Sequence, residues 1–285
     1  MWKLRSEARE LQIGDRLGGY RLDEPLGEGG MGLVFRAVRE ASGETVALKV
    51  LKLELSDDDV FRRRFKQEAR AAAEVKSRHL VPILEAGEAD GRDFLAVQYV
   101  DGETLDERLK TAGPLSVDDA VRLARELGAG LDALHAAGIV HRDIKASNVM
   151  IDREGSALLT DFGLAKGRAY TVLTRPGQVM GTLDYLAPEL IKGQAAQAAS
   201  DVYALGCTVF ECVTGRTPFA DKTMFQVGLA HLEEPPPDPA TLRDDLSTSF
   251  CKAVLWALEK EPEKRPPSAS AYATMLQVSA QRRFG

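Results

Sequence analysis

The stretch of residues 141–150, HRDIKASNVM, places several polar side chains between apolar runs. Asp143 is followed two places on by Lys145 and five places on by Asn148, and Asp161 comes 13 residues after Asn148, in DFG. Carboxylate and amide oxygens suit Mg²⁺, which keeps water and phosphate oxygens as its other ligands. Asp143, Asn148 and Asp161 are therefore candidates for contact with a metal–phosphate substrate. Each residue alone is equally typical of a turn or a helix cap.

A glycine-rich stretch, GEGGMGLV, supplies Gly27, Gly29 and Gly32, with Val34 two residues after the last glycine. Glycine lets the backbone approach a phosphate closely. A dinucleotide-binding fingerprint needs a helix after the glycines, whereas the β-type run LVFRAVRE follows them here. The pattern disfavours a Rossmann dehydrogenase and predicts a flap between two strands, with a plain hairpin turn as the alternative.

A lysine and a glutamate are candidates for an ion pair. Lys49 ends VALK and shares a strand face with Ala47. A strand lysine is usually a solvated edge residue unless a carboxylate faces it. Glu68 is the only charge in the apolar stripe of a helix expected over residues 58–76, and such a charge is costly unless paired. We therefore expect Glu68 to pair with Lys49. The other stripe members are Phe61, Phe65, Ala72 and Val75, and residues 62–64 are expected to form a mostly solvated face.

The secondary structure predicted to hold these residues changes along the chain from mostly strands to mostly helices. Up to residue 98, short β-type runs alternate with glycine turns around the one helix. Beyond it, helical spacing follows a Ser116 N-cap, recurs near 199–214, 222–232, 246–259 and 268–281, and a short strand pair surrounds NVMID and ALLTD. The sequence predicts an α+β fold with two lobes and a ligand in the cleft between them. The β-rich lobe spans 1–98, with 1–18 as an N-terminal extension, and the helical lobe spans 99–285.

The composition of the chain limits which kinds of binding partner we expect. The chain has 285 residues, 44% of them hydrophobic, and a net charge of −6, which argues against nucleic acid as the main partner. No apolar run reaches the length of a membrane span, so we expect no membrane contact within this chain. The three cysteines fit no metal-ligand spacing and indicate reduced, buried thiols. A cytoplasmic protein is expected, or the cytoplasmic domain of a longer, membrane-anchored one.

In this order and spacing, the motifs resemble those of a eukaryotic-type (Hanks-type) serine/threonine protein kinase, most of all its bacterial members. The resemblance runs from about Tyr20 to Leu276 and implies a bilobal fold, with a small antiparallel sheet and one main helix in the N-lobe and a mostly helical C-lobe. It implies transfer of the γ-phosphate of ATP to Ser and Thr hydroxyls of proteins. Asp143 would accept or orient the hydroxyl proton, and Lys145 would neutralise the γ-phosphate.

The resemblance also implies a nucleotide site. Lys49, paired with Glu68, would hold the α- and β-phosphates, and Asn148 and Asp161 would bind Mg²⁺ or Mn²⁺. Backbone groups of Gln98 and Val100 would meet adenine; many relatives have Glu in place of Gln98. The residues implied to bind ATP and its metal are Leu26, Gly27, Gly29, Gly32, Val34, Ala47, Lys49, Val97, Gln98, Val100, Asn148 and Asp161.

Two structural contacts and a regulatory segment are implied as well. Glu189 in APEL would pair with Arg265, and Asp201 would brace the catalytic loop. Residues between Asp161 and Glu189 form a segment poor in large apolar anchors, in which a phosphothreonine would bind cations. The regulatory residues would be Thr171, Thr174 and Arg142, helped by Lys166 and Arg168. Autophosphorylation would occur between two molecules in a transient dimer, with Thr174 slightly preferred. Ordinary loop threonines in a constitutively ordered kinase are the alternative.

Two other functions are compatible with the same fold. A pseudokinase scaffold is disfavoured because the residues that it would lack are present: Lys49, Glu68, Asp143, Asn148 and Asp161. A small-molecule phosphotransferase is disfavoured by the peptide-positioning segment GTLDYLAPE. By resemblance, Lys145 and Thr182 indicate Ser/Thr rather than Tyr as the acceptor.

Overall fold

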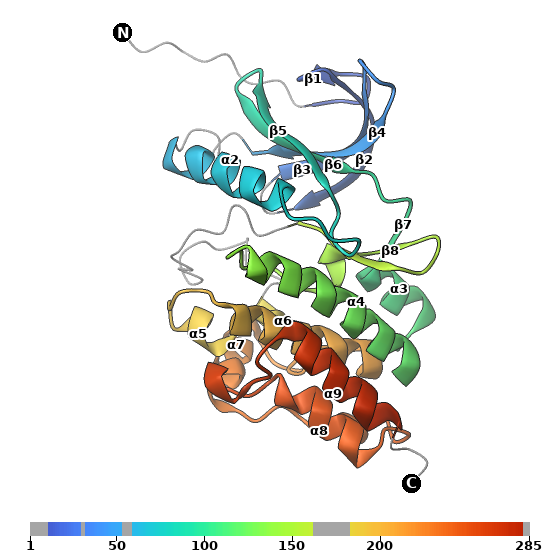
Figure 1. The fold of residues 1–285 in the computed structure, drawn as a ribbon, viewed down its shortest axis with the longest axis vertical. Coiled ribbons are helices and arrows are strands. Elements are labelled where there is room, and N and C mark those ends of the chain that lie inside the picture. The colour runs from blue at the N-terminus through green and yellow to red at the C-terminus, as the bar shows by residue number, and fades with distance from the viewer. Residues whose placement is uncertain (1–10, 30–31, 53–58, 162–182, 282–285) are drawn as a thin grey trace. The chain divides into compact units, whose positions relative to one another are not determined.

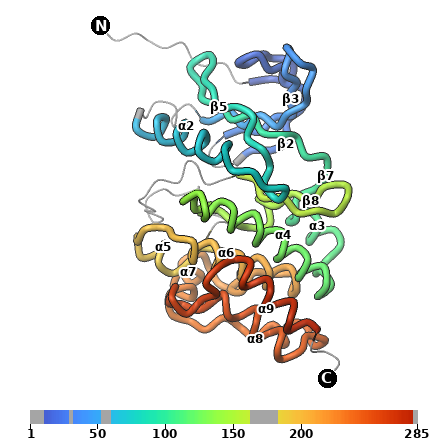
Figure 2. Tube along the Cα trace, viewed as in Figure 1, coloured from blue at the N-terminus to red at the C-terminus, as the bar shows by residue number. Residues whose placement is uncertain are grey.

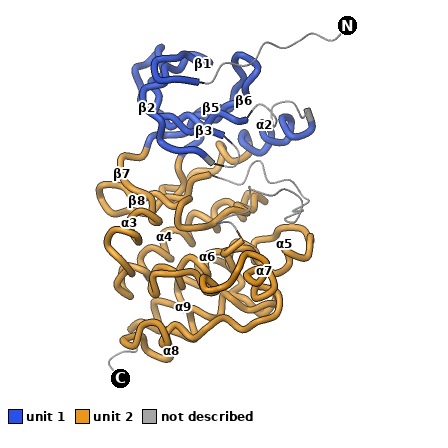
Figure 3. The backbone as a smooth tube through the Cα atoms, turned by 180° about the vertical axis from the view of Figure 1, so that it is seen from behind, with its two compact units in different colours: residues 1–70, 82–99 blue, residues 71–81, 100–285 orange. Residues whose placement is uncertain are grey.

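The computed structural model describes residues 11–29, 32–52, 59–161 and 183–281 (Figure 1). The chain divides into two compact units (Figure 3): unit 1 has residues 1–70 and 82–99, and unit 2 has residues 71–81 and 100–285. The functional division into lobes at residues 98 and 99 stays a prediction. Within the described ranges, no helix combines the length and apolar character needed to span a bilayer.

Unit 1 contains a six-stranded sheet in the order β1-β2-β3-β4-β6-β5, and every neighbouring pair is antiparallel. Figure 2 follows the chain trace through β2, β3 and β5 of this sheet. The strand after the glycines returns alongside the strand before them, so the predicted flap between two strands is confirmed. The two-residue strand β1 lies inside the expected N-terminal extension, and its Leu17 is buried. The strands are β1 Arg16–Leu17, β2 Tyr20–Gly29, β3 Gly32–Arg39, β4 Thr45–Leu51, β5 Ile83–Ala89 and β6 Arg92–Gln98.

Because side chains alternate along β4, every second one faces away from the core. Val46, Leu48 and Val50 are buried, while Ala47 and Lys49 are half-buried on the opposite face, as predicted. The buried set packs with apolar side chains of the neighbouring strands into one core. The other members of this core include Tyr20, Leu22, Phe35, Ala37, Phe94 and Ala96.

The predicted helix is α2, Asp59–Ala73. Its buried residues are Phe65, Ala69 and Ala72, and Glu68 is half-buried. Glu74 is exposed and lies beyond the helix end. The predicted stripe members Phe65 and Ala72 are therefore confirmed as buried, whereas Val75 lies beyond the helix end and does not belong to the stripe.

The described residues of unit 2 form helices and a three-stranded sheet, β7-β8-β9. Helix α6 lies at its centre, in contact with α4, α8 and α9, and all three cysteines are free and buried, as expected. The helices expected from the sequence are confirmed within a few residues. The elements are α3 Leu105–Ala112, α4 Val117–Ala136, α5 Pro188–Ile191, α6 Ala198–Thr214, α7 Met224–Glu233, α8 Thr248–Trp256, α9 Ala269–Gln281, β7 Gly102–Thr104, β8 Val149–Asp152, β9 Ala157–Leu159 and four 3-10 turns, among them η1 Ala146–Asn148.

Two helices of unit 2 show how local sequence sets helix starts. Ser116 accepts a hydrogen bond from the N–H of Asp119 at 3.1 Å, which confirms the predicted N-cap of α4. Helix α3 was not predicted, although a capping box marks its start. The Thr104 hydroxyl accepts from the N–H of Glu107, and the Glu107 carboxylate accepts from the N–H of Thr104.

Glu211 near the end of α6 is a largely buried acid whose titration affects stability. Burial raises its pKa to about 7, while the Tyr185 hydroxyl donates to its Oε2 at 2.6 Å. An acid with a raised folded-state pKa binds more protons in the folded protein, so stability falls as pH rises from its unfolded pKa, about 4.3. The loss is complete once the pH passes the folded-state value.

Glu211→Gln removes this titration and keeps an oxygen acceptor for Tyr185. As the pH rises from 4.5 to 8, the free energy of unfolding of the variant should increase relative to that of the wild type by roughly 3 kcal/mol. Urea unfolding at both pH values measures this difference. Glu233→Gln, at an exposed acid on α7, is the control and should show no such change. The same difference at both pH values for Glu211→Gln would contradict the burial argument.

Candidate active site

In unit 1, the candidate phosphate-binding residues lie on three neighbouring strands. Gly29 of β2 pairs with Gly32 of β3, and Gly27 pairs with Val34. Val34 pairs in turn with Lys49 of β4, whose other neighbour is Leu95 of β6. The structure thus brings the glycine turn, Val34 and Lys49 together on one sheet, as the sequence predicted.

Gly32 and Gly27 differ in what a side chain at each position would contact. A Cβ on Gly32 would lie 1.9 Å from the carbonyl oxygen of Val50, so the close approach of β3 to β4 itself requires glycine there. A Cβ on Gly27 would meet no atom within 4 Å. Packing alone therefore does not explain Gly27, and the open space above it leaves room for a ligand group.

The candidate adenine-binding residues of unit 1 lie on β2, on β4 and on β6, the neighbour of β4 in the sheet. Ala47 of β4 pairs with Val97 of β6, so the two residues are side by side on the sheet. The N–H of Gln98 donates to the carbonyl of Pro82 at 2.9 Å. Because this N–H is already used, the expected backbone contact of Gln98 with adenine is limited to its carbonyl. Leu26 is exposed on β2, and Val100 is half-buried in unit 2.

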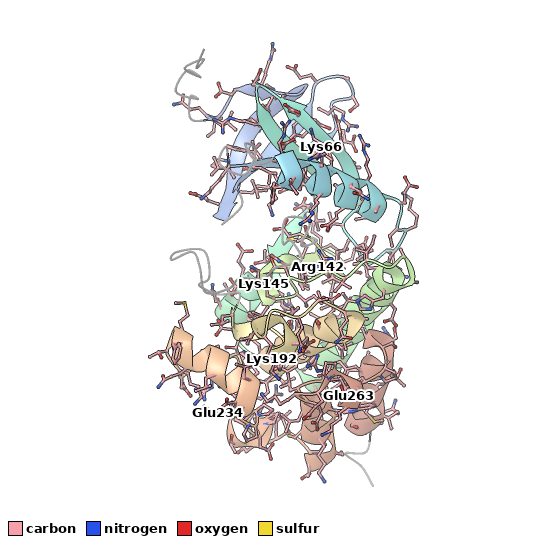
Figure 4. The ribbon with its side chains drawn as sticks, turned by 90° about the vertical axis from the view of Figure 1, so that its left-hand side faces the viewer. Lys66, Arg142, Lys145, Lys192, Glu234 and Glu263 are labelled. Atoms are coloured by element: carbon pink, nitrogen blue, oxygen red, sulfur yellow. The ribbon has the colours of Figure 1, made fainter. Side chains whose placement is uncertain are left out.

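In unit 2, three predicted site residues meet in one loop: the catalytic candidates Asp143 and Lys145 and the candidate metal ligand Asn148. The side-chain amide of Asn148 donates to the Asp143 carbonyl at 2.8 Å and to Asp143 Oδ2 at 3.0 Å. The Lys145 ammonium lies 3.6 Å from the same Oδ2. Figure 4 shows Lys145 with Arg142, on the stretch that leads into η1. The amide of Asn148 and the ammonium group of Lys145 together fix the orientation of the Asp143 carboxylate, as a contact with a substrate requires.

Asp201 at the start of α6 fixes the backbone of this loop. Its Oδ2 accepts from the N–H of His141 and its Oδ1 from the N–H of Arg142, both at 2.8 Å. Arg142 has φ of 66°, a left-handed conformation that is unfavourable for a residue with a Cβ. The two hydrogen bonds hold this conformation, so the predicted bracing role of Asp201 is confirmed. His135 of α4 adds a contact to Oδ2 at 2.7 Å.

His141 contributes to the loop, although the sequence did not assign it a role. Its Nδ1 accepts from the N–H of Asp143 at 3.3 Å, so Nε2, 3.1 Å from the Thr160 carbonyl, is the donor. Burial lowers the pKa of His141, which favours this neutral form. His141 therefore links the catalytic loop to the end of β9. The only signal in the sequence was its place directly before Arg142 and Asp143.

The candidate metal ligands fit a hard cation by their chemistry. Thr160 donates its N–H to the carbonyl of Asn148 at 3.0 Å, which places the backbone before Asp161 next to η1. The Asn148 nitrogen is used on Asp143, so its Oδ1 is the atom left to coordinate a metal. Asp161 supplies a carboxylate and has φ of 56°. An amide and a carboxylate oxygen suit Mg²⁺, which keeps further positions for water and phosphate.

The predicted pair of Glu189 and Arg265 is confirmed as a buried ion pair with two parallel contacts of 2.8 Å.

The structure describes only one of the predicted regulatory residues. Arg142 lies half-buried in the catalytic loop. Thr171 and Thr174, with Lys166, Arg168 and Thr182, lie outside the described residues, so their predicted roles stay predictions.

Comparisons with known proteins agree with one another. Residues 20–276 match the model of a family described as protein kinase domain. The serine/threonine-protein kinase PknH of Mycobacterium tuberculosis is 39% identical over 94% of this chain, which covers 43% of that relative. PknE of the same organism is 37% identical over 97% of this chain, which covers 49% of that relative. The chain thus spans less than half the length of these curated relatives.

A solved structure extends the likeness to three dimensions. The PknI kinase domain of Mycobacterium tuberculosis superimposes with a TM-score of 0.77 at 28% identity. The match covers 95% of this chain and all of the PknI domain. The expected fold class, an antiparallel N-lobe sheet with a helical C-lobe, is confirmed.

Proposed function

Because the chain belongs to the protein kinase domain family, we propose that it transfers the γ-phosphate of ATP to serine and threonine hydroxyls of proteins. The family match and the relatives confirm the resemblance that the motifs predicted. The observation that carries the proposal is the arrangement of Asp143, Lys145 and Asn148 around one carboxylate oxygen.

Each residue of that arrangement receives a role in the transfer. Asp143 orients the acceptor hydroxyl and accepts its proton, and the amide of Asn148 fixes the direction of the Asp143 carboxylate. Lys145 stabilises negative charge on the phosphoryl group in transfer. Phosphoryl transfer demands alignment and charge neutralisation rather than covalent chemistry from the protein. The buried, braced loop is suited to supply both.

Family membership implies the use of ATP and a divalent metal ion. We assign Asn148 and Asp161 to Mg²⁺ or Mn²⁺, since their oxygens suit a hard cation. A bound metal ion neutralises charge on the phosphates of ATP. In unit 1, Lys49 is assigned to the α- and β-phosphates, Glu68 to pairing with Lys49, and the open space above Gly27 to phosphate oxygens. The carbonyl of Gln98 and the backbone of Val100 are assigned to adenine.

Incubation with γ-labelled ATP, Mg²⁺ and a protein rich in Ser, Thr and Tyr tests the proposal. Phosphoamino acid analysis should recover label as phosphoserine and phosphothreonine, with little phosphotyrosine. ATP binding without transfer would instead indicate a scaffold. Label that reaches only small acceptors would indicate a small-molecule phosphotransferase.

Regulation by autophosphorylation is the finer part of the proposal. Thr171 and Thr174 lie between Asp161 and Glu189, and a phosphothreonine there would add about −1.5 to −2 charge opposite Arg142. Mass spectrometry before and after phosphatase treatment should locate phosphate on these threonines. Thr171→Ala/Thr174→Ala should lower kcat/KM by about tenfold. Full activity in this double variant would leave the threonines as ordinary loop residues.

The proposed partners are protein substrates with Ser or Thr and, transiently, a second copy of the chain. Transfer between copies predicts an initial autophosphorylation rate that rises with the square of protein concentration. A rate proportional to concentration would show transfer within one molecule. We place the domain in the cytoplasm, where ATP is available.

A further inference from the structure

Four charged side chains of unit 1 form a closed network between α2 and the β5–β6 hairpin. Arg62 donates from Nε to Asp93 Oδ2 at 2.8 Å and also pairs with Glu88. Lys66 Nζ lies 3.0 Å from Glu88 Oε2 and 3.1 Å from Asp93 Oδ1. We call these four residues the α2 lock: Arg62, Lys66, Glu88 and Asp93. Figure 4 shows Lys66 on α2.

The two carboxylates of the α2 lock are unfavourable without their cations. Glu88 and Asp93 are direct cross-strand partners, and like charges in such a pair repel each other. Asp93 is moreover completely buried, at 0% exposed, and a buried carboxylate is strongly destabilising unless it is paired. Arg62 and Lys66 offset both penalties by pairing with the two carboxylates. The lock therefore selects one placement of α2 against the hairpin.

The cations remain charged in this setting. Burial alone lowers the pKa of the Lys66 ammonium, but its hydrogen bonds to Glu88 and Asp93 outweigh that effect and the pKa is raised. Arg62 is a guanidinium and stays protonated. Arg62 is half-buried, whereas the rest of residues 62–64 form the mostly solvated face that the sequence predicted. Only Arg63 and Arg64 are exposed.

Helical geometry connects the α2 lock to Glu68. At about 100° per residue, Arg62 and Lys66 flank one side of the buried stripe and Glu68 flanks the other, about 140° away around the axis. The stripe between them is Phe65, Ala69 and Ala72. A rotation of α2 that moved Glu68 would therefore have to break the charge contacts on the opposite flank.

We propose that the α2 lock is a set of positioning residues that fixes the rotation of α2 and so presents Glu68 to Lys49. This inference rests on the proposed function, in which Lys49 and Glu68 serve ATP. Arg62, Lys66, Glu88 and Asp93 touch neither substrate nor nucleotide in this proposal. They act through Glu68 alone.

A double-mutant cycle between Asp93 and Glu68 tests this dependence. Asp93→Asn keeps the shape of the side chain and removes its charge, and should lower kcat by about tenfold while circular dichroism stays unchanged. Glu68→Gln should lower kcat by itself. In the Glu68→Gln background, Asp93→Asn should lower kcat by less than about twofold further, because the lock has no other route to the reaction.

Matched variants separate positioning from general stability. Arg64→Gln removes an exposed charge from the same helix and should leave kcat unchanged. Lys66→Arg keeps a cation for both carboxylates and should retain activity within about twofold, whereas Lys66→Met should not. If Asp93→Asn does not fold, Lys66→Met takes its place in the cycle, since Arg62 still pairs Asp93 there.

The results of these experiments distinguish failure of the inference from failure of the proposed function. Losses of kcat that multiply in the double variant would show a purely structural brace and overturn the inference, while the proposed function would stand. Wild-type kinetics in both Asp93→Asn and Lys66→Met would overturn it as well. A wild-type protein that transfers no phosphate would overturn the proposed function and this inference with it.

Discussion

Asp143→Asn is expected to fold like the wild type and to lose phosphoryl transfer by about 10²–10⁴-fold, the usual contribution of a positioned general base. The substitution is nearly isosteric. An asparagine at this position cannot accept a proton. It must also direct its oxygen toward the Asn148 amide, which now donates to Asp143 Oδ2 at 3.0 Å. The favourable contact with the Lys145 ammonium, 3.6 Å away, is weakened as well.

Single-turnover transfer of label from γ-labelled ATP measures this loss without interference from product release. Nucleotide affinity, measured separately by titration with a fluorescent ATP analogue, should change little because Asp143 is not assigned to the nucleotide. Asp244→Asn makes the same change at an exposed acid of unit 2 and serves as the control. Transfer in Asp143→Asn at a rate close to that of the control would remove Asp143 from the mechanism.

Local patterns were sufficient to predict the elements that carry the site. The alternation of Val46, Leu48 and Val50 with Ala47 and Lys49 identified which face of β4 the lysine occupies. The Ser116 cap located the start of α4. The spacing within HRDIKASN likewise identified Asp143 and Asn148 as candidates for one substrate site, and the short loop and 3-10 turn between them bring the two side chains together. These signals act over short stretches of chain, where sequence and geometry are closely coupled.

Contacts between distant segments could not be predicted in the same way. Arg62 and Asp93 are 31 residues apart, and His141 and Asp201 are 60 apart. Periodicity shows that a charge lies near a helix edge, but it does not show which carboxylate the folded sheet will bring there. The sequence predicted a mostly solvated face over residues 62–64, but it did not show that Arg62 would contact Asp93. Short strands such as β1 and β7 were missed because two or three residues contain no period to detect.

Two long-range contacts were predicted by resemblance: Asp201 with the catalytic loop, and Glu189 with Arg265. The structure shows why loss of the second contact should strongly destabilise the protein. Arg265 uses all five of its N–H donors: two on Glu189, at 2.8 Å each, and three on backbone carbonyls of Glu259, Lys260 and Ala199. Its guanidinium also lies over the Tyr203 ring, 4.8 Å from the centroid. The Ser200 hydroxyl donates to the same Glu189 carboxylate at 2.6 Å. Both charged side chains are almost completely excluded from solvent, at 0% and 2% exposed.

Arg265→Ala should therefore lower the free energy of unfolding by about 3–5 kcal/mol, because it leaves the Glu189 carboxylate buried without its counter-charge. Arg265→Lys should also be strongly destabilising, since an ammonium group keeps the charge but cannot reproduce the planar fork of five donors. Urea unfolding at pH 7 measures both losses. Lys264→Ala, at the neighbouring exposed ion pair with Glu261, should cost no more than about 1 kcal/mol.

The pH dependence of these losses distinguishes a lost ion pair from a lost packing contact. Burial raises the pKa of Glu189, but the hydrogen bonds from Arg265 and Ser200 outweigh it and the pKa is lowered. A carboxylate with a lowered folded-state pKa stabilises the protein above its unfolded pKa, about 4.3, and that stabilisation disappears as pH falls through the folded-state value. The stability gap between wild type and Arg265→Ala should therefore be largest near neutral pH and should narrow below pH 4. A gap that stays constant from pH 7 to the acid limit would assign the loss to the packing of the Arg265 side chain on Tyr203 instead of its charge.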